Sequence, residues 1–337
     1  MKNVQNIWII LLAIALAGCE IASGPDDEDF KKELMQEPAH NFSYYDDFFD
    51  PSSSLVDRIR TEDQFVLEYL MDFDNKDNYS FYEPTEKQKE LLDEYFKLLP
   101  LKYQEKLSER LLAIYFVNDY VASGMTDYVL EKNSDDIYTI LIFNSALIDH
   151  PMDSWITKKE NTCFIDDDES IDIEIDIDSE YTGLLYILIH ECTHVMDYTT
   201  EITPYTEPDI GKLKNTMDNT SPFTEGVWTD YRNPQGENDF FLRDKISFYG
   251  FKNGPLLSEE FAIDIYTNLM KSKFVSLYGS TNWAEDLAEY MTYYHLTQKL
   301  GLEYSITVYF DDSLVFRYAP FNNDDILSRI DDLPDFY

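Results

Sequence analysis

The segment His190-Glu191-Cys192-Thr193-His194 carries the residues whose types and spacing could do chemistry. Residues four apart lie on one face of an α-helix, so both imidazoles can reach the same ion. Two histidines at this spacing, with a glutamate beside the first, are typical of a zinc hydrolase site. The sequence therefore predicts Zn²⁺ bound by His190 and His194, with Glu191 taking a proton from the water that the metal activates.

The residues before the motif favour a buried helix. Leu184 to Ile189 form an apolar run that leads directly into His190. A fortuitous HExxH motif would usually fall on a polar surface helix, whereas an active-site helix lies in the core. We therefore expect a buried helix that starts at about Thr182, with a chance match on a structural helix as the alternative.

A catalytic zinc site needs a third protein ligand, because the fourth position is kept for water. Glu285 and Glu289 are four residues apart and share a helical face. Glu285 can bind the metal while Glu289 accepts a hydrogen bond from a ligand histidine. Two rival ligands stay open: Glu260, and Asp197, which returns to the face of His190 after seven residues.

The stretch from Tyr278 to Glu289 reads Tyr-Gly-Ser-Thr-Asn-Trp-Ala-Glu-Asp-Leu-Ala-Glu. It resembles the family of the anthrax lethal factor protease domain, which carries Tyr-Gly-x-Thr-Asn-x-Ala-Glu-x-x-Ala-Glu there. In that family the HExxH helix also has an aspartate three residues after the second histidine, as Asp197 stands here, and an aromatic residue close behind, like Tyr198. The resemblance covers about a third of the chain, residues 186–294.

The resemblance implies a gluzincin-type zinc endopeptidase with a zincin-like α+β fold. It implies metal ligands at His190, His194 and Glu285, with Glu191 as the general base. It further implies the following supporting residues: Tyr278 as the phenol that stabilises the oxyanion, and Glu289 and Asp197 as carboxylates behind the ligands. The chain departs from the family at Cys192 and Thr193, which face away from the metal, so the departure concerns packing.

Other functions stay open beside a peptidase. A non-catalytic surface lipoprotein could keep zinc for binding, although a structural site needs no base such as Glu191 and is usually closed by a fourth protein ligand. A zinc hydrolase could instead act on a non-peptide amide. Tyr278 could also be a core aromatic residue, since it is one of 26 tyrosines.

The N-terminus has the features of an export signal. Lys2 is followed by a short apolar core from Ile7 to Ala17, too short to be a transmembrane helix. Leu16-Ala17-Gly18-Cys19 resembles a bacterial lipobox, so residues 1–18 are expected to be a signal peptide and Cys19 to carry lipid. We expect an extracytoplasmic protein anchored to the outer membrane; an ordinary secretory peptide is the alternative.

Residues 19–50 are expected to form a flexible acidic tether. The run Ser23-Gly24-Pro25-Asp26-Asp27-Glu28-Asp29 resembles the surface-export signal of Bacteroidetes lipoproteins. A solvated spacer is the alternative. The formal charge of −40 argues against nucleic acid or anionic lipid headgroups as partners. It favours cationic peptides as substrates, or simply high solubility.

Residues 51–337 are expected to form one catalytic domain of α+β class, with a helical N-terminal portion over residues 51–125. Periodicity predicts helices at residues 61–73, 85–98, 103–119, 258–274 and 281–300. Strands are predicted at residues 137–143, 170–178 and 305–310. Isoleucine alternates with acidic residues over residues 170–178, so this strand is expected to be half-buried with one acidic face. Residues 203–254 are expected to be irregular. Either of the first two strands could hold an extended substrate by strand addition. Cys163 and Cys192 are expected to be buried free thiols, with a disulfide as the alternative.

Overall fold

The computed structural model describes residues 27–333 except 169, 178, 252 and 253. The expected signal peptide and the expected lipidation site, Cys19, therefore lie outside the described residues. In the part that is described, helices and three small sheets form an α+β fold, as predicted. No helix of that part is both long and apolar enough to cross a membrane.

The first sheet has the strand order β1-β2-β4-β3. Its bounds are β1 Ser80–Phe81, β2 Leu111–Asn118, β3 Gly124–Leu130 and β4 Ile137–Asn144. β4 pairs in parallel with β2 and antiparallel with β3, so the predicted strand at residues 137–143 is central, and β3 is an edge strand. Alternate residues of β4 are buried on opposite faces, because helices cover both sides.

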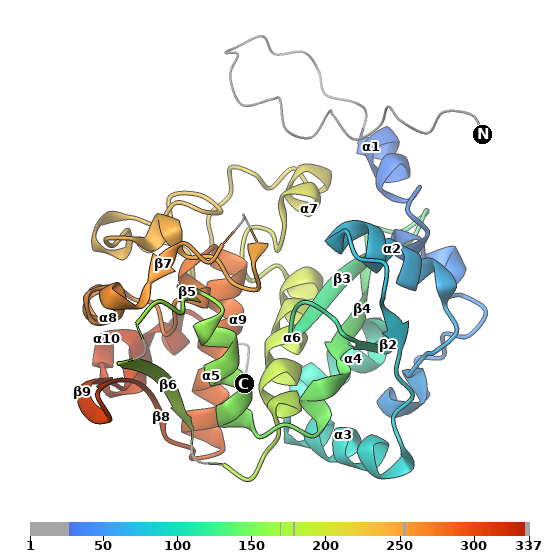
Figure 1. Ribbon diagram of the computed structural model, residues 1–337. Helices are drawn as coiled ribbons and strands as arrows, with labels where there is room; N and C mark the ends of the chain where they lie inside the picture. Colours follow the sequence, from blue (N-terminus) through green and yellow to red (C-terminus); the bar gives the residue numbers. More distant parts are fainter. Residues whose placement is uncertain (1–26, 169, 178, 252–253, 334–337) are drawn as a thin grey trace, which may run out of the picture.

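Four helices build the two layers around this sheet (Figure 1). Their bounds are α2 Gln64–Asp74, α3 Glu86–Leu98, α4 Leu101–Arg110 and α6 Gly183–Thr200. α2 packs on one face through Val66 and Leu70. The other three helices share the larger core on the opposite face, where the Tyr103 hydroxyl of α4 lies 3.0 Å from the Thr193 hydroxyl of α6.

The predicted helix at residues 103–119 is wrong in its second half. α4 ends at Arg110 and β2 begins at the next residue. The sequence Leu-Leu-Ala-Ile-Tyr-Phe-Val-Asn is rich in β-branched and aromatic residues, which suit a strand buried on both faces. The expected helical portion over residues 51–125 therefore also contains β1, β2 and the start of β3.

The expected flexible tether is wrong for residues 27–50. This segment forms α1 (Asp27–Leu34) and the short helical turns η1 (Pro38–His40) and η2 (Phe42–Tyr44). Ala39 and Tyr45 are fully buried, and Asn41 forms an isolated parallel bridge with Leu130 of β3. Aromatic side chains between the acids supply the apolar area that anchors the segment.

The second half of the molecule lies on the other side of α6 (Figure 1). Its helices are α5 Met152–Asn161, α8 Ala262–Leu269, α9 Trp283–Tyr294, continued by a π-helical turn at His295–Lys299, and α10 Asp324–Leu327. The short helix α7 (Pro208–Leu213) lies apart from them, because its Ile210 packs with Tyr128 and Leu130 of β3. Its strands are β5 Phe164–Ile165 with β7 Leu257–Ser258, and β6 Ile171–Ile177, β8 Tyr304–Phe310 and β9 Ser313–Tyr318 in the order β6-β8-β9. The alternation predicted for β6 is confirmed, since Ile173, Ile175 and Ile177 are buried.

A buried ion pair ties the C-terminal part of the chain to α9. The Arg329 guanidinium donates to both oxygens of Asp286, at 2.8 and 2.7 Å. The indole N–H of Trp228 donates to the same carboxylate at 2.9 Å. Asp286 is fully buried, so the cation is needed to compensate its charge.

Replacement of Arg329 by Met leaves the Asp286 carboxylate buried without its cation. We expect the free energy of unfolding to fall by about 3–5 kcal/mol, as measured by chemical denaturation. Lys97→Met is the control, because Lys97 forms an exposed pair with Asp93 and its loss should change stability little. Equal stability of the two variants would contradict the anchoring role.

Candidate metal centre

The motif histidines lie on α6, a helix buried on nearly all sides. The apolar run from Leu184 to Ile189 is in the core, and His190 and His194 are 2% and 8% exposed. A helix that is apolar all round belongs in the interior, which is where the sequence predicts it. α6 ends at Thr200, followed by Glu201 in the left-handed conformation.

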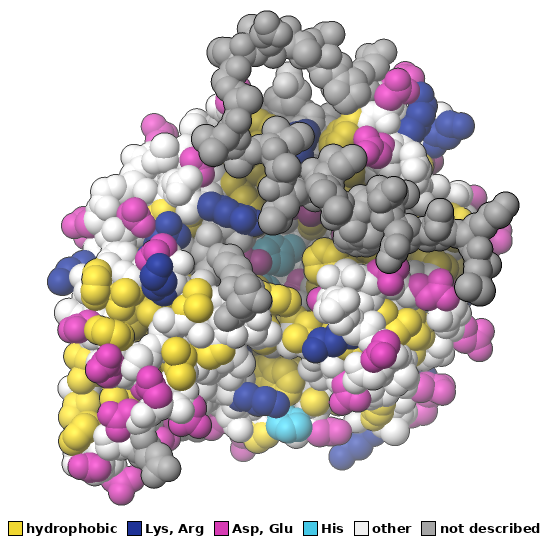
Figure 2. Space-filling model, turned by 45° about the horizontal axis from the view of Figure 1, so that its top comes forward, with side chains coloured by type: hydrophobic (Ala, Val, Ile, Leu, Met, Phe, Trp, Pro, Cys, Tyr) yellow, Lys and Arg dark blue, Asp and Glu magenta, His cyan; other side chains and the backbone are white. Residues whose placement is uncertain are grey.

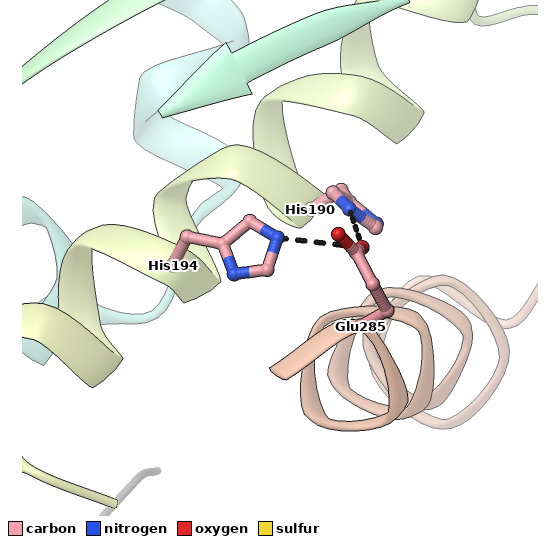
Figure 3. A group of neighbouring side chains, drawn as sticks. All are labelled: His190, His194 and Glu285. Carbon is pink, nitrogen blue, oxygen red and sulfur yellow. Dashed lines mark hydrogen bonds and ion pairs between the residues drawn. The ribbon is translucent and has the colours of Figure 1, made fainter. Parts of the chain in front are cut away.

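The third side chain comes from the first turn of α9. Asn282 caps this helix, since its side-chain oxygen accepts from the backbone N–H groups of Ala284 and Glu285. Glu285 Oε2 lies 3.1 Å from His190 Nε2 and 3.5 Å from His194 Nε2 (Figure 3). The two helices therefore bring together residues that are 95 positions apart in the sequence.

The ligand atoms of these three side chains all lie within 4.8 Å of one another, so the group can hold a metal ion. Over the described residues, no other such group of three histidine, cysteine or acidic side chains forms. The side chains of His194 and Glu285 are 11% and 20% exposed, so the group is reached from the surface. The surface drawn in Figure 2 has a hollow with histidine and acidic atoms at its bottom.

The electrostatics of the group favour a positive charge at its centre. Burial alone would lower the pKa of His190, but its close contacts with the Glu285 and Glu289 carboxylates and the charge of Glu191 raise it to about 9. Burial likewise opposes ionisation of Glu285, yet the two histidines hold its pKa far below its ordinary value. Two imidazole nitrogens and one carboxylate are also the donor set that a catalytic zinc ion takes.

Glu289 supports His190 from behind, one turn after Glu285 on α9. Its Oε1 lies 3.0 Å from Nδ1 of His190. A proton on Nδ1 that faces this carboxylate leaves the Nε2 lone pair directed at the centre of the group. Lys159 and Tyr186 contact the same oxygen, and Ser276 donates to the other at 2.6 Å.

Glu191 lies beside the group without joining it. Its carboxylate accepts a hydrogen bond of 2.8 Å from the Thr126 hydroxyl of β3. Burial raises its pKa above the ordinary value, against the opposing charges of the two histidines. β3 approaches closely because of Gly124: a Cβ there would lie 2.9 Å from Ile187 and 3.0 Å from the Glu191 carboxylate.

Tyr278 lies next to His190 in the turn η9 (Tyr278–Ser280), with 5.9 Å between the ring centroids. Burial, and then the charge of Glu285, raise the pKa of Tyr278 well above its ordinary value. The phenol therefore keeps its proton at neutral pH. Gly279 allows η9 to lie against α9, because a Cβ there would come within 3.3 Å of the Glu289 Cβ.

The rival ligands lie elsewhere. Glu260 is exposed in the turn η8 (Glu259–Phe261) and takes no part in the group. Asp197 is buried, but it accepts hydrogen bonds from the N–H and hydroxyl of Thr203, at 2.7 and 2.6 Å. Asp197 thus stabilises the segment that follows α6. Its interaction with His194 is electrostatic.

Several residues around the centre were not predicted from the sequence. Thr126 was missed because the edge strand β3 was not predicted. Lys159 was missed although a signal exists: it continues the buried face of α5 after Trp155 and Ile156, where a lysine is unusual. Cys163 and Cys192 are buried free thiols, as the sequence favours.

Comparison with protein-family models, curated proteins and solved structures gives no match to this chain. The geometry of the group therefore carries the functional interpretation.

If Glu285 is the third ligand, Glu285→Ala should lower zinc affinity far more than Glu260→Ala. His190→Ala and His194→Ala should also lose zinc, because each removes one of three converging donors. Metal analysis of the purified variants measures this against an expected stoichiometry of one zinc per chain. Full zinc content in Glu285→Ala would exclude Glu285 as a ligand.

Proposed function

We propose that the protein is a zinc-dependent metalloendopeptidase of the gluzincin type, in line with the resemblance in its sequence. Glu285 supports this most directly, because its carboxylate converges with Nε2 of both motif histidines. Glu191 adds a buried carboxylate beside the group that is not a ligand. A purely structural zinc site would have no use for such a base.

His190, His194 and Glu285 would hold the metal. Bound Zn²⁺ would supply Lewis-acid activation of water and of the scissile carbonyl. Glu191 takes the proton from the attacking water and delivers it to the leaving amine. Tyr278 donates a hydrogen bond to the oxyanion as charge develops, and its high pKa keeps this donor available.

An extended peptide would bind along β3. The strands now seen as β4 and β6 are the two candidates from the sequence, but β4 is paired on both sides and β6 belongs to a different sheet. β3 is an edge strand. Its Thr126 donates to the Glu191 carboxylate, and a Cβ at Gly124 would lie 3.0 Å from the same carboxylate. A peptide added to this edge would pass the proposed base, and the bridge to Asn41 covers the far end of the strand.

The proposal also includes the location of the enzyme and the charge of its substrates. The lipobox at Cys19 supports a lipid anchor and a position outside the cytoplasm, at the outer membrane or the cell surface. The formal charge of −40 favours cationic peptides over nucleic acid as partners. Digestion of a peptide library, with and without a chelator, separates a peptidase from a zinc-binding lipoprotein and from a hydrolase of other amides.

Glu191→Gln should retain zinc, because Glu191 is not a ligand, and should lose activity by about 10²–10⁴-fold, as is typical when a general base is removed. Metal analysis and peptide cleavage by the same preparation test both halves. A near-wild-type rate would point to a different base. Loss of zinc would instead make Glu191 part of the metal-binding group.

Tyr278→Phe removes the hydroxyl and keeps the ring packed against His190. We expect kcat to fall by about 10²–10³-fold, because the donor acts on charge that develops in the transition state. KM and zinc content should change little. Full kcat on a good peptide substrate would leave Tyr278 with a packing role alone.

A further inference from the structure

Lys159 is a buried lysine directly behind the metal centre. It projects from α5, and its side chain is only 3% exposed. Its Nζ lies 3.1 Å from Glu289 Oε1 and 2.5 Å from the Tyr186 hydroxyl. The same Nζ lies over the ring of Tyr278, 4.0 Å from its centroid.

Packing alone does not explain a lysine at this position. An ammonium group is costly to bury unless an anion and hydrogen-bond acceptors surround it. The neighbouring positions on the same face of α5, Trp155 and Ile156, are apolar, and a methionine would fill similar space. The contacts of Nζ point to a more specific role, since they join two separate parts of the proposed site.

The first contact orients the carboxylate behind His190. Glu289 Oε1 lies within 3.1 Å of His190 Nδ1, Lys159 Nζ and the Tyr186 hydroxyl. Of these three partners, Lys159 brings the ammonium group that pairs with the charge of the carboxylate. Burial opposes ionisation of Glu289, yet Lys159 and then His190 lower its pKa to about 2.

The second contact holds the ring of Tyr278. A cation over the face of an aromatic ring is attracted by the ring quadrupole, and more strongly where water is excluded. Phe248 packs edge-on against the same ring, with 5.0 Å between centroids. The Tyr278 ring is thereby confined between His190, Phe248 and the lysine.

We propose that Lys159 is a positioning residue that sets both supports of the proposed metallopeptidase site: the Glu289 carboxylate behind His190 and the ring of Tyr278. This role rests on the proposed function, because it assumes that the His190 group binds zinc. One cation then couples metal affinity to the placement of the phenol. Tyr278→Phe keeps the ring and its cation contact, so it should leave metal affinity alone, whereas loss of the Lys159 charge should change both.

The test compares Lys159→Met with Glu160→Gln. Glu160 is the next residue of α5 and is equally buried, but its side chain bonds the Tyr266 hydroxyl at 2.7 Å. Zinc affinity is measured by competition with a chromophoric chelator. The visible spectrum of the Co²⁺-substituted protein reports ligand geometry independently of activity.

Lys159→Met should bind zinc about 10–100-fold more weakly, as is typical when a support behind a ligand is lost. It should also change the Co²⁺ spectrum and lower kcat, while Glu160→Gln matches the wild type. Wild-type zinc affinity and an unchanged spectrum in Lys159→Met would overturn the role. If Lys159→Met does not fold, Lys159→Gln takes its place in the comparison with Glu160→Gln. The glutamine amide can still donate to Glu289 but carries no charge, so this variant tests the loss of the charge.

The wild-type protein separates the two proposals. If it binds zinc but cleaves no peptide, the peptidase function fails, and the role of Lys159 is still decided by zinc affinity and the Co²⁺ spectrum. If Lys159→Met keeps wild-type zinc affinity in an active peptidase, the role of Lys159 alone fails. A wild-type chain that binds no zinc overturns both.

Discussion

The contact between α6 and α9 is the constraint on which the rest of the centre depends. The rigid imidazole ring of His190 meets Glu285 through Nε2 and Glu289 through Nδ1, so one side chain aligns two successive turns of α9. These three side chains are largely buried, and a shift of either helix would leave a charge without its partner. The neighbouring parts of the fold hold α6 and α9 in this register.

Three carboxylates crowd around this contact, in a chain whose formal charge is already −40. Like charges at close range in a low-dielectric interior repel, so each carboxylate needs its own compensation. Glu285 contacts the two histidines, Glu191 has their charges nearby and the Thr126 hydroxyl as a donor, and Glu289 pairs with Lys159. Because the partners differ, three residues of one type are suited to different roles in the proposed site: ligand, base and orienting group.

The remaining elements bring these partners into place from distant parts of the chain. β3 carries Thr126 and can lie against α6 only because Gly124 has no side chain. η9 lies against α9 for the same reason at Gly279. The N-terminal segment packs over the other end of β3, so the folded body of the protein begins well before residue 51.

Local patterns in the sequence were sufficient to place His190 and His194 on one buried helix, α6, and to predict the alternation of β6. Helical and strand periodicities are properties of neighbouring residues, so His190, His194 and the buried isoleucines could be predicted. The third ligand was favoured through the spacing of Glu285 and Glu289 and through a family resemblance, but only the packing of α9 against α6 excludes Glu260 and Asp197 from the group. β3 was beyond local patterns, and the local signals in β2 and around Lys159 do not identify the partners of these residues. A strand is stabilised by the strand it pairs with, and a buried lysine by an anion 130 residues away in the sequence. These stabilising contacts join residues that no local periodicity relates. Only the tertiary structure therefore decides which residues become partners.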